Sequence, residues 1–170
     1  MNVHLAEVLQ AVGRLADLHE ELISIARRMR EAIAADDVGT VSALTRLEEK
    51  TAKSIAEWDD VRIRATTAYM ASMGTTVVPS SFTVEQLIRF ISRAEDKQAL
   101  MREAERLGKA VAQFKELHDL NMQLVRQALA FVQYSLDVLA GSHAEEATYT
   151  PPDRSASVQA ARRTFFDTRA

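Results

Sequence analysis

The first candidates for metal binding in this chain are its four histidines, His4, His19, His118 and His143. Helical bundles build di-iron sites from a glutamate that lies three positions before a histidine on an inward-facing side of a helix. None of the four histidines has a glutamate at that position, and the reversed pairs, with Glu7 and Glu146, lie near the ends of the helical part. We therefore expect no metal site and no cofactor.

Other catalytic patterns are missing from the sequence as well. The chain has no cysteine, which excludes a thiolate nucleophile and a disulfide framework. It also lacks a glycine-rich phosphate loop, a Gly-x-Ser-x-Gly nucleophile motif and a dinucleotide fingerprint. Acidic neighbours such as Glu48 and Glu49 diverge by about 100° on a helix, which indicates a solvated surface rather than a pair of catalytic acids. We expect no catalytic residue and predict that the protein is not an enzyme.

Charge and hydropathy argue against two classes of partner. The net charge of −3 provides no broad attraction for nucleic acid or anionic lipid. Stacking of Trp58 on a base would need basic neighbours, but Asp59 and Asp60 follow it. The apolar and weakly charged stretch at residues 127–136 is shorter than the ~20 residues that span a bilayer, and the N-terminus lacks the pattern of a signal peptide. We expect a cytoplasmic protein with no nucleic-acid partner and no membrane insertion.

Two long helices begin the predicted fold. Apolar residues over 5–33 recur at alternating spacings of three and four, which is typical of a long helix that packs at a shallow angle. Asp36 and Asp37 supply a turn and an N-cap for the next helix. A similar stripe covers residues 41–69, and this second helix is expected to end near Gly74.

A short helix and a third long helix complete the pattern. Thr83 and Gln86 form a capping box for the short helix, which should run to about residue 92. The third long helix has its apolar register over residues 100–139 and is expected to end at Gly141. This succession predicts an all-α fold, an antiparallel bundle of three long helices with a short fourth helix and a flexible C-terminal tail.

Two domains follow from this pattern: a helical bundle domain over residues 1–140, and a flexible recognition tail over residues 141–170. The tail has too few buried aliphatic residues to offset the entropy of ordering itself. It nevertheless carries Tyr149 just before two prolines, which favour extended backbone in the preceding residues. Near its end it carries Phe165 and Phe166, which could contact a partner or dock back on the bundle. These features indicate a binding module.

Four polar residues fall in register with the apolar seams, namely His19, Thr51, His118 and Asn121. If the middles of the three long helices lie at one level, His19 should face His118 or Asn121. A buried polar layer that fixes the register of the helices is the favoured interpretation, and a ligand site is the alternative.

The third helix is expected to be longer than its partners, at about 45 residues against about 30, which is a difference of more than 20 Å. Its excess carries four apolar residues without obvious cover within the chain, namely Leu129, Val132, Leu136 and Leu139. Such side chains must contact another chain or self-associate. The alternative, in which the short helix shifts the register and the other end of the third helix overhangs, stays open.

Several segments together resemble the FlgN family of flagellar type III export chaperones. The sharpest are Leu-Asn-Met-Gln-Leu at 120–124 and Ala-Leu-Ala-Phe-Val at 128–132, followed by Thr-Tyr at 148–149 and Arg-Arg-Thr-Phe-Phe-Asp at 162–167. The likeness extends over nearly the whole chain. The sequence departs from the family pattern at Thr150, which is followed by two prolines where a glycine is usual.

The resemblance implies a cytosolic chaperone for the hook-associated proteins that join hook and filament. Such a chaperone prevents their premature assembly and delivers them to the cytoplasmic domain of the flagellar export gate. The residues expected to bind the client are Leu129, Val132, Leu136, Leu139, Phe165 and Phe166. Tyr149 is expected to bind the export gate.

A different class of function stays open beside this one. The same heptad seams would suit a self-assembling coiled-coil scaffold or adaptor without a role in export. The chain could form a homo-oligomer under either hypothesis. A third class, a ferritin-like enzyme, is disfavoured by the missing ligand pairs.

Overall fold

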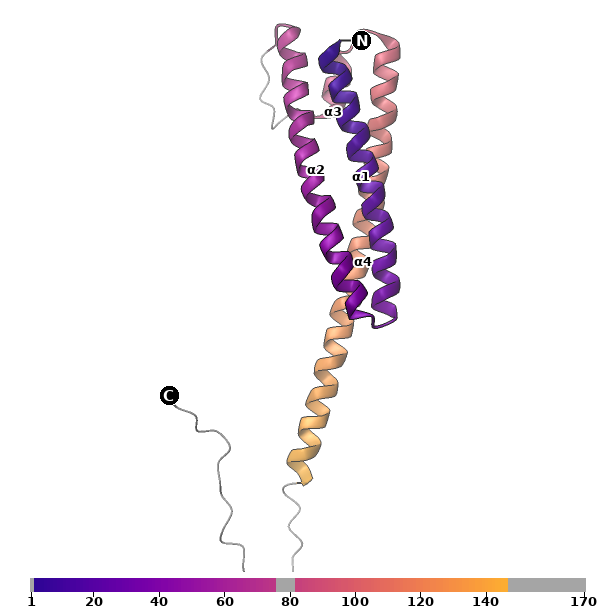
Figure 1. The fold of residues 1–170 in the computed structure, drawn as a ribbon, viewed down its shortest axis with the longest axis vertical. Coiled ribbons are helices and arrows are strands. Elements are labelled where there is room, and N and C mark those ends of the chain that lie inside the picture. The colour runs from indigo at the N-terminus through magenta and orange to yellow at the C-terminus, as the bar shows by residue number, and fades with distance from the viewer. Residues whose placement is uncertain (1, 76–81, 147–170) are drawn as a thin grey trace, which may run out of the picture. The chain divides into compact units, whose positions relative to one another are not determined.

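The structure is a computed structural model that describes residues 2–75 and 82–146, with side chains described up to residue 140. Within these ranges the chain forms four helices and no strand: α1 (Val3–Ala34), α2 (Val38–Ser72), α3 (Val84–Phe90) and α4 (Ala94–Glu146) (Figure 1). The all-α prediction is confirmed. The chain divides into two compact units, Met1–Ala128 and Leu129–Ala170.

The helix starts follow from local hydrogen-bonding chemistry. The Asp37 carboxylate accepts a hydrogen bond from the Thr40 amide at 3.0 Å, which confirms the predicted N-cap of α2. Asp36 beside it has a φ of 54°, a left-handed conformation that aspartate tolerates in turns. The capping box of Thr83 and Gln86 at the start of α3 is also confirmed.

The first unit is built on α1. Near its N-terminal end, Leu5 lies in one buried cluster with Tyr69 and Met70 from the end of α2. Met29, near the other end of α1, lies in a second cluster with Leu44 from the start of α2. The two helices therefore run in opposite directions, as a short connection between packed helices requires.

The first part of α4 runs in the same direction as α1. Leu100 lies in the cluster with Leu5, and further along α4 the Asn121 amide donates a hydrogen bond to the Ala26 carbonyl at 2.8 Å. Between these contacts the Arg106 guanidinium reaches α1. This succession of contacts sets the register of α4 on α1 inside the first unit.

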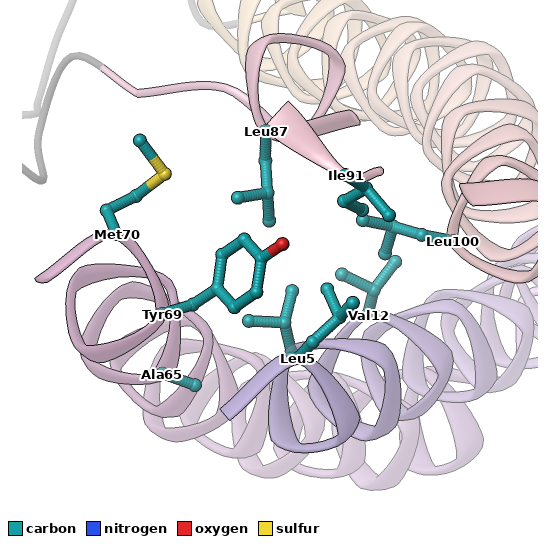
Figure 2. Close-up of a cluster of buried hydrophobic side chains, with 9 residues drawn as sticks. Leu5, Val12, Ala65, Tyr69, Met70, Leu87, Ile91 and Leu100 are labelled. Carbon is teal, nitrogen blue, oxygen red and sulfur yellow. The ribbon is translucent and has the colours of Figure 1, made fainter. Parts of the chain in front are cut away.

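The short helix α3 packs across from α1. Leu87 and Ile91, which are 1% and 6% exposed, point toward Leu5 on α1, while Tyr69 and Leu100 flank them from α2 and α4 (Figure 2). A helix of seven residues is marginal by itself in water, so this packing is what stabilises it.

Two predicted boundaries need correction. The predicted third long helix begins at Ala94, and α4 passes through Gly141 to Glu146 instead of ending at that glycine. A glycine inside a helix costs only about 1 kcal/mol relative to alanine, and no proline follows within the next turns to stop the helix. By contrast, α2 does end beside Gly74, which has a φ of 75°.

The predicted pairing of His19 with His118 or Asn121 is wrong. His19 Nδ1 lies 2.8 Å from the Leu15 carbonyl of its own helix, and His118 Nδ1 lies 3.3 Å from a carboxylate oxygen of Glu48. Because Leu100 lies in one cluster with Leu5 and α4 has 53 residues against 32 in α1, the middles of the two helices are not level. Asn121 and Thr51 are buried, as expected, at 6% and 4% exposure.

The second unit begins at Leu129 and includes the helical residues up to Glu146. Three residues with a predicted binding role, Tyr149, Phe165 and Phe166, lie outside the residues that the structure describes.

Candidate functional site

Four predicted client-binding residues lie on one side of α4 in the second unit, at spacings of three and four. Their side chains are strongly exposed, with fractions of 63% for Leu129, 53% for Val132, 61% for Leu136 and 60% for Leu139. Residues three and four apart are neighbours on a helix surface, so these side chains form one apolar strip. We call Leu129, Val132, Leu136 and Leu139 the client strip, after the role predicted for them.

A second group of exposed apolar residues occupies the opposite side of the same helical segment. Phe131, Tyr134 and Val138 are 70%, 68% and 51% exposed. Their spacing of three and four is the signal that could have identified them, but the sequence prediction followed only the seam that contains Val132. The segment is therefore apolar on two sides, which is uncommon for a helix in contact with water.

Little charge interrupts these two apolar sides. Among residues 128–140 only Asp137 is acidic and none is basic, and the other polar groups belong to Gln133, Tyr134 and Ser135. The Ser135 hydroxyl is already used, because it donates to the Phe131 carbonyl at 2.8 Å. What the segment offers a partner is apolar area, and the matching surface is the apolar side of another helix.

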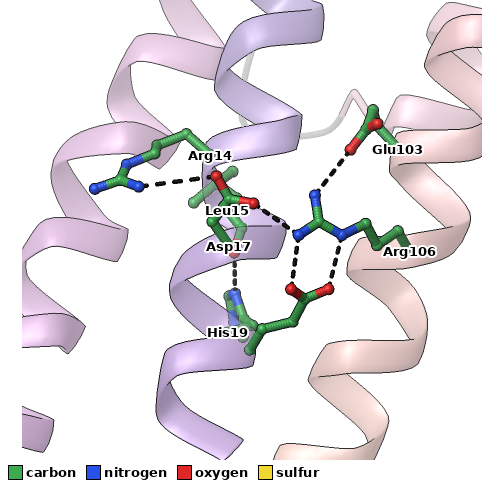
Figure 3. Close-up of polar contacts among 7 residues, drawn as sticks. Arg14, Leu15, Asp17, His19, Glu103 and Arg106 are labelled. Atoms are coloured by element: carbon green, nitrogen blue, oxygen red, sulfur yellow. Dashed lines mark hydrogen bonds and ion pairs between the residues drawn. The ribbon is translucent and has the colours of Figure 1, made fainter.

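An ion-pair network fixes α4 to α1 within the first unit (Figure 3). The Arg106 guanidinium donates two hydrogen bonds to the Glu20 carboxylate, each of 2.7 Å, and one of 2.7 Å to Asp17. It also reaches Glu103 on its own helix at 3.4 Å. The hydrogen bonds from Arg106 hold the pKa of Glu20 below its usual value, and the same contacts raise the pKa of Arg106.

The described residues contain no arrangement for metal binding. No group of three or more histidine, cysteine or acidic side chains converges there on a point where an ion could be held. His4 does contact Glu7 at 3.4 Å, but this exposed pair has no third ligand within that part of the chain. None of the helices in the described ranges combines the length and the hydropathy needed to cross a membrane.

Comparison with known proteins identifies the family of this chain. The model of the family described as FlgN protein matches residues 1–156. The chain is also 28% identical over 132 residues to a protein of Bacillus subtilis (strain 168) described as uncharacterized protein YvyG, and the match covers 78% of each chain. No solved structure matches. The family match extends over both helical units, and the chain belongs to the FlgN family.

Proposed function

We propose that this protein is a cytoplasmic export chaperone of the flagellum, which binds hook-associated proteins and delivers them to the export gate. Membership of the FlgN family supports the general role. The observation that carries the proposal is the client strip, because a chaperone must keep apolar surface accessible until its client arrives. No catalytic step is part of this function.

The client strip is suited to an amphipathic helix of a client. Full burial of a leucine or valine side chain contributes about 1.5–3 kcal/mol, and more than half of each strip residue is still accessible. Leu129, Val132 and Leu136 can therefore each contribute about 1 kcal/mol when a partner covers them. That sum suits reversible binding, because a client must be released at the export gate.

Delivery to the gate needs a second contact, and we assign it to Tyr149. A tyrosine supplies both apolar area and a hydroxyl, and this combination is frequent among residues that dominate binding energy. Phe165 and Phe166 are assigned to the client, where two aromatic rings would add contact area beyond the client strip. The segment of residues 141–170 would then act as the recognition tail.

The experiment that tests the client strip is a double substitution. Val132→Asp with Leu136→Asp removes two apolar contacts and places two carboxylates in the interface, so the affinity for a hook-associated protein should fall by about 3 kcal/mol, roughly a hundredfold. Isothermal titration calorimetry with the purified client measures the change. The bundle should keep its helicity, because both side chains are already exposed.

The matched control carries the same two charges, also four residues apart, on the other side of the helix, as Gln123→Asp with Gln127→Asp, since both glutamines are exposed. Its affinity should stay within about threefold of the wild-type value, which is less than 1 kcal/mol. Equal losses in the two variants would contradict a specific client strip. Light scattering during size exclusion tests the scaffold alternative, which requires a mass that grows with concentration.

A further inference from the structure

Two hollows lie along the first unit between α2 and α4, over the same side of α1. The upper hollow, of about 430 Å³, has Leu15 on its floor and Ile55 and Val111 on its two walls. The lower hollow, of about 520 Å³, has Met29 on its floor and Ala52 and Met122 on its walls. We call the two hollows together the α2–α4 groove.

The helix α3 is in line with the α2–α4 groove, next to the upper hollow. Phe82 and Val84, at its start, border the upper hollow, while Leu87 and Ile91 are buried between the end of α2 and the start of α4. Thus α3 occupies the position of a fourth helix of the bundle for about two turns. The α2–α4 groove continues this position beyond Val84, the first residue of α3. The molecule itself shows that this position accepts the apolar side of a helix.

The dimensions of the α2–α4 groove match a helix. On α1 the lining runs from Leu15 to Ile33, which corresponds to about 27 Å at 1.5 Å per residue. The lining residues of each wall recur at spacings close to whole helical turns, such as Glu48, Ala52 and Ile55 on α2 and His118, Met122 and Val125 on α4. A straight partner helix of about 18 residues would span this length.

The chemistry of the lower hollow indicates what such a helix must carry. Met122 on the α4 wall is 40% exposed, which leaves apolar area for a partner. The α2 wall bears the carboxylates of Glu48 and Glu49, and a carboxylate oxygen of Glu48 lies 3.3 Å from His118 Nδ1. On the floor the buried Asn121 amide donates to Ala26, but its oxygen has no partner within the described part of the chain. Carboxylates and a free acceptor favour a cationic donor.

We propose that the α2–α4 groove binds an amphipathic helix that has lysine or arginine along the flank of its apolar side. The helix belongs to an export client, and this assignment rests on the proposed chaperone function. It would complete the fourth position of the bundle below α3, with its apolar side toward Met29 and Met122 and its basic flank toward Glu48 and Glu49.

Two exposed alanines of α2 give a matched test. Ala52 borders the lower hollow, whereas Ala43 is nine residues away and so lies on the opposite side of the helix. Ala52→Arg fills the hollow and repels a basic flank, and Ala43→Arg adds the same side chain elsewhere. The probes are a purified hook-associated protein and two synthetic 18-residue amphipathic helices, one with lysine flanks and one with glutamate flanks.

We expect the lysine-flanked peptide to bind the full chain at least tenfold more tightly than the glutamate-flanked peptide. Ala52→Arg should weaken binding of that peptide and of the client at least tenfold, and Ala43→Arg by less than twofold. If the client binds and both variants behave alike, the groove is not its site, although the chaperone proposal survives. If the wild-type chain binds no client, both proposals fail.

A photo-crosslinker at position 52 identifies the occupant directly. Crosslinks to the client and to the lysine-flanked peptide support the proposal. Crosslinks to residues 147–170 of the same chain, or to a second copy of it, would overturn the assignment of the occupant.

Discussion

The Arg106 network makes a quantitative prediction about the bundle. Arg106→Met keeps most of the apolar stem of the side chain but removes three hydrogen bonds of 2.7 Å between α4 and α1. An exposed ion pair contributes about 0.2–1 kcal/mol, and the side chains of Arg106, Glu20 and Asp17 are 38%, 48% and 46% exposed. With the bidentate geometry to Glu20 and the second partner Asp17, we expect a loss of about 1–2 kcal/mol in the free energy of unfolding.

The pH dependence separates this network from a general packing effect. The pKa of Glu20 is lowered in the folded chain from an ordinary value of 4.5, chiefly by its hydrogen bonds from Arg106. A lowered pKa means that the stabilisation is fully present above pH 4.5 and is lost as the pH falls through the folded-state value. The difference in stability between the wild type and Arg106→Met should therefore be largest near neutral pH and shrink below pH 4.5.

Urea unfolding followed by circular dichroism at pH 7 and pH 3 measures both quantities. Lys109→Met is the matched control, because the Lys109 ammonium pairs with Glu105 on its own helix and does not connect two helices. Salt at 1 M should reduce the Arg106 effect, since the screening length there is about 3 Å. Equal losses for the two methionine variants at pH 7, or an Arg106 effect that persists unchanged at pH 3, would refute the reasoning.

The remaining predictions concern one buried and one terminal residue. Asn121→Leu should leave the free energy of unfolding in urea unchanged or raise it by about 1 kcal/mol. The substitution removes one hydrogen bond, but it also removes a buried oxygen that has no partner within the described part of the chain. A loss above 2 kcal/mol would show that the hydrogen bond to Ala26 dominates. Tyr149→Ala should weaken binding to the cytoplasmic domain of the export gate by about 2 kcal/mol and leave client affinity unchanged, as separate titrations with the two partners would show. Equal loss for both partners, or for neither, would contradict the separate roles.

The positions of the helices could be predicted because their signals are local. The side chain of Asp37 accepts from an amide three residues ahead, and the capping box of Thr83 and Gln86 also lies within one turn. Apolar residues at alternating spacings of three and four identify the buried side of a helix, and this signal does not depend on which element packs against it. The end of α4 was mispredicted because a single glycine at position 141 is only a weak signal.

The register between helices could not be predicted in the same way. It depends on contacts between residues far apart in the sequence, such as Arg106 with Glu20 and Asn121 with Ala26. The prediction for His19 assumed that the helix middles are level, but the contacts of Leu5 with Leu100 and of Ala26 with Asn121 make the early parts of α1 and α4 level instead. Apolar periodicity is nearly invariant to a shift of one heptad, so it cannot choose between such registers.

Of the two exposed apolar sides of α4 in the second unit, one was predicted from the sequence and the other was missed. A single helical seam led to Leu129, Val132, Leu136 and Leu139, all of which are exposed in the structure. The search stopped there because a helix packed on one side needs only one apolar stripe. A second stripe on the opposite side has no role in such a fold, so its presence points to contacts with other chains.

The length of α3 links the fold to the proposed binding of helices. Seven residues cannot form a stable helix alone, so the burial of Leu87 and Ile91 must supply most of the stabilisation of α3. A longer α3 would continue along α2 and α4 and cover the apolar area around Met122. Because the helix begins only at Val84, that area stays accessible to another helix. The short α3 therefore combines a stable upper core with a lower groove that an amphipathic partner can fill.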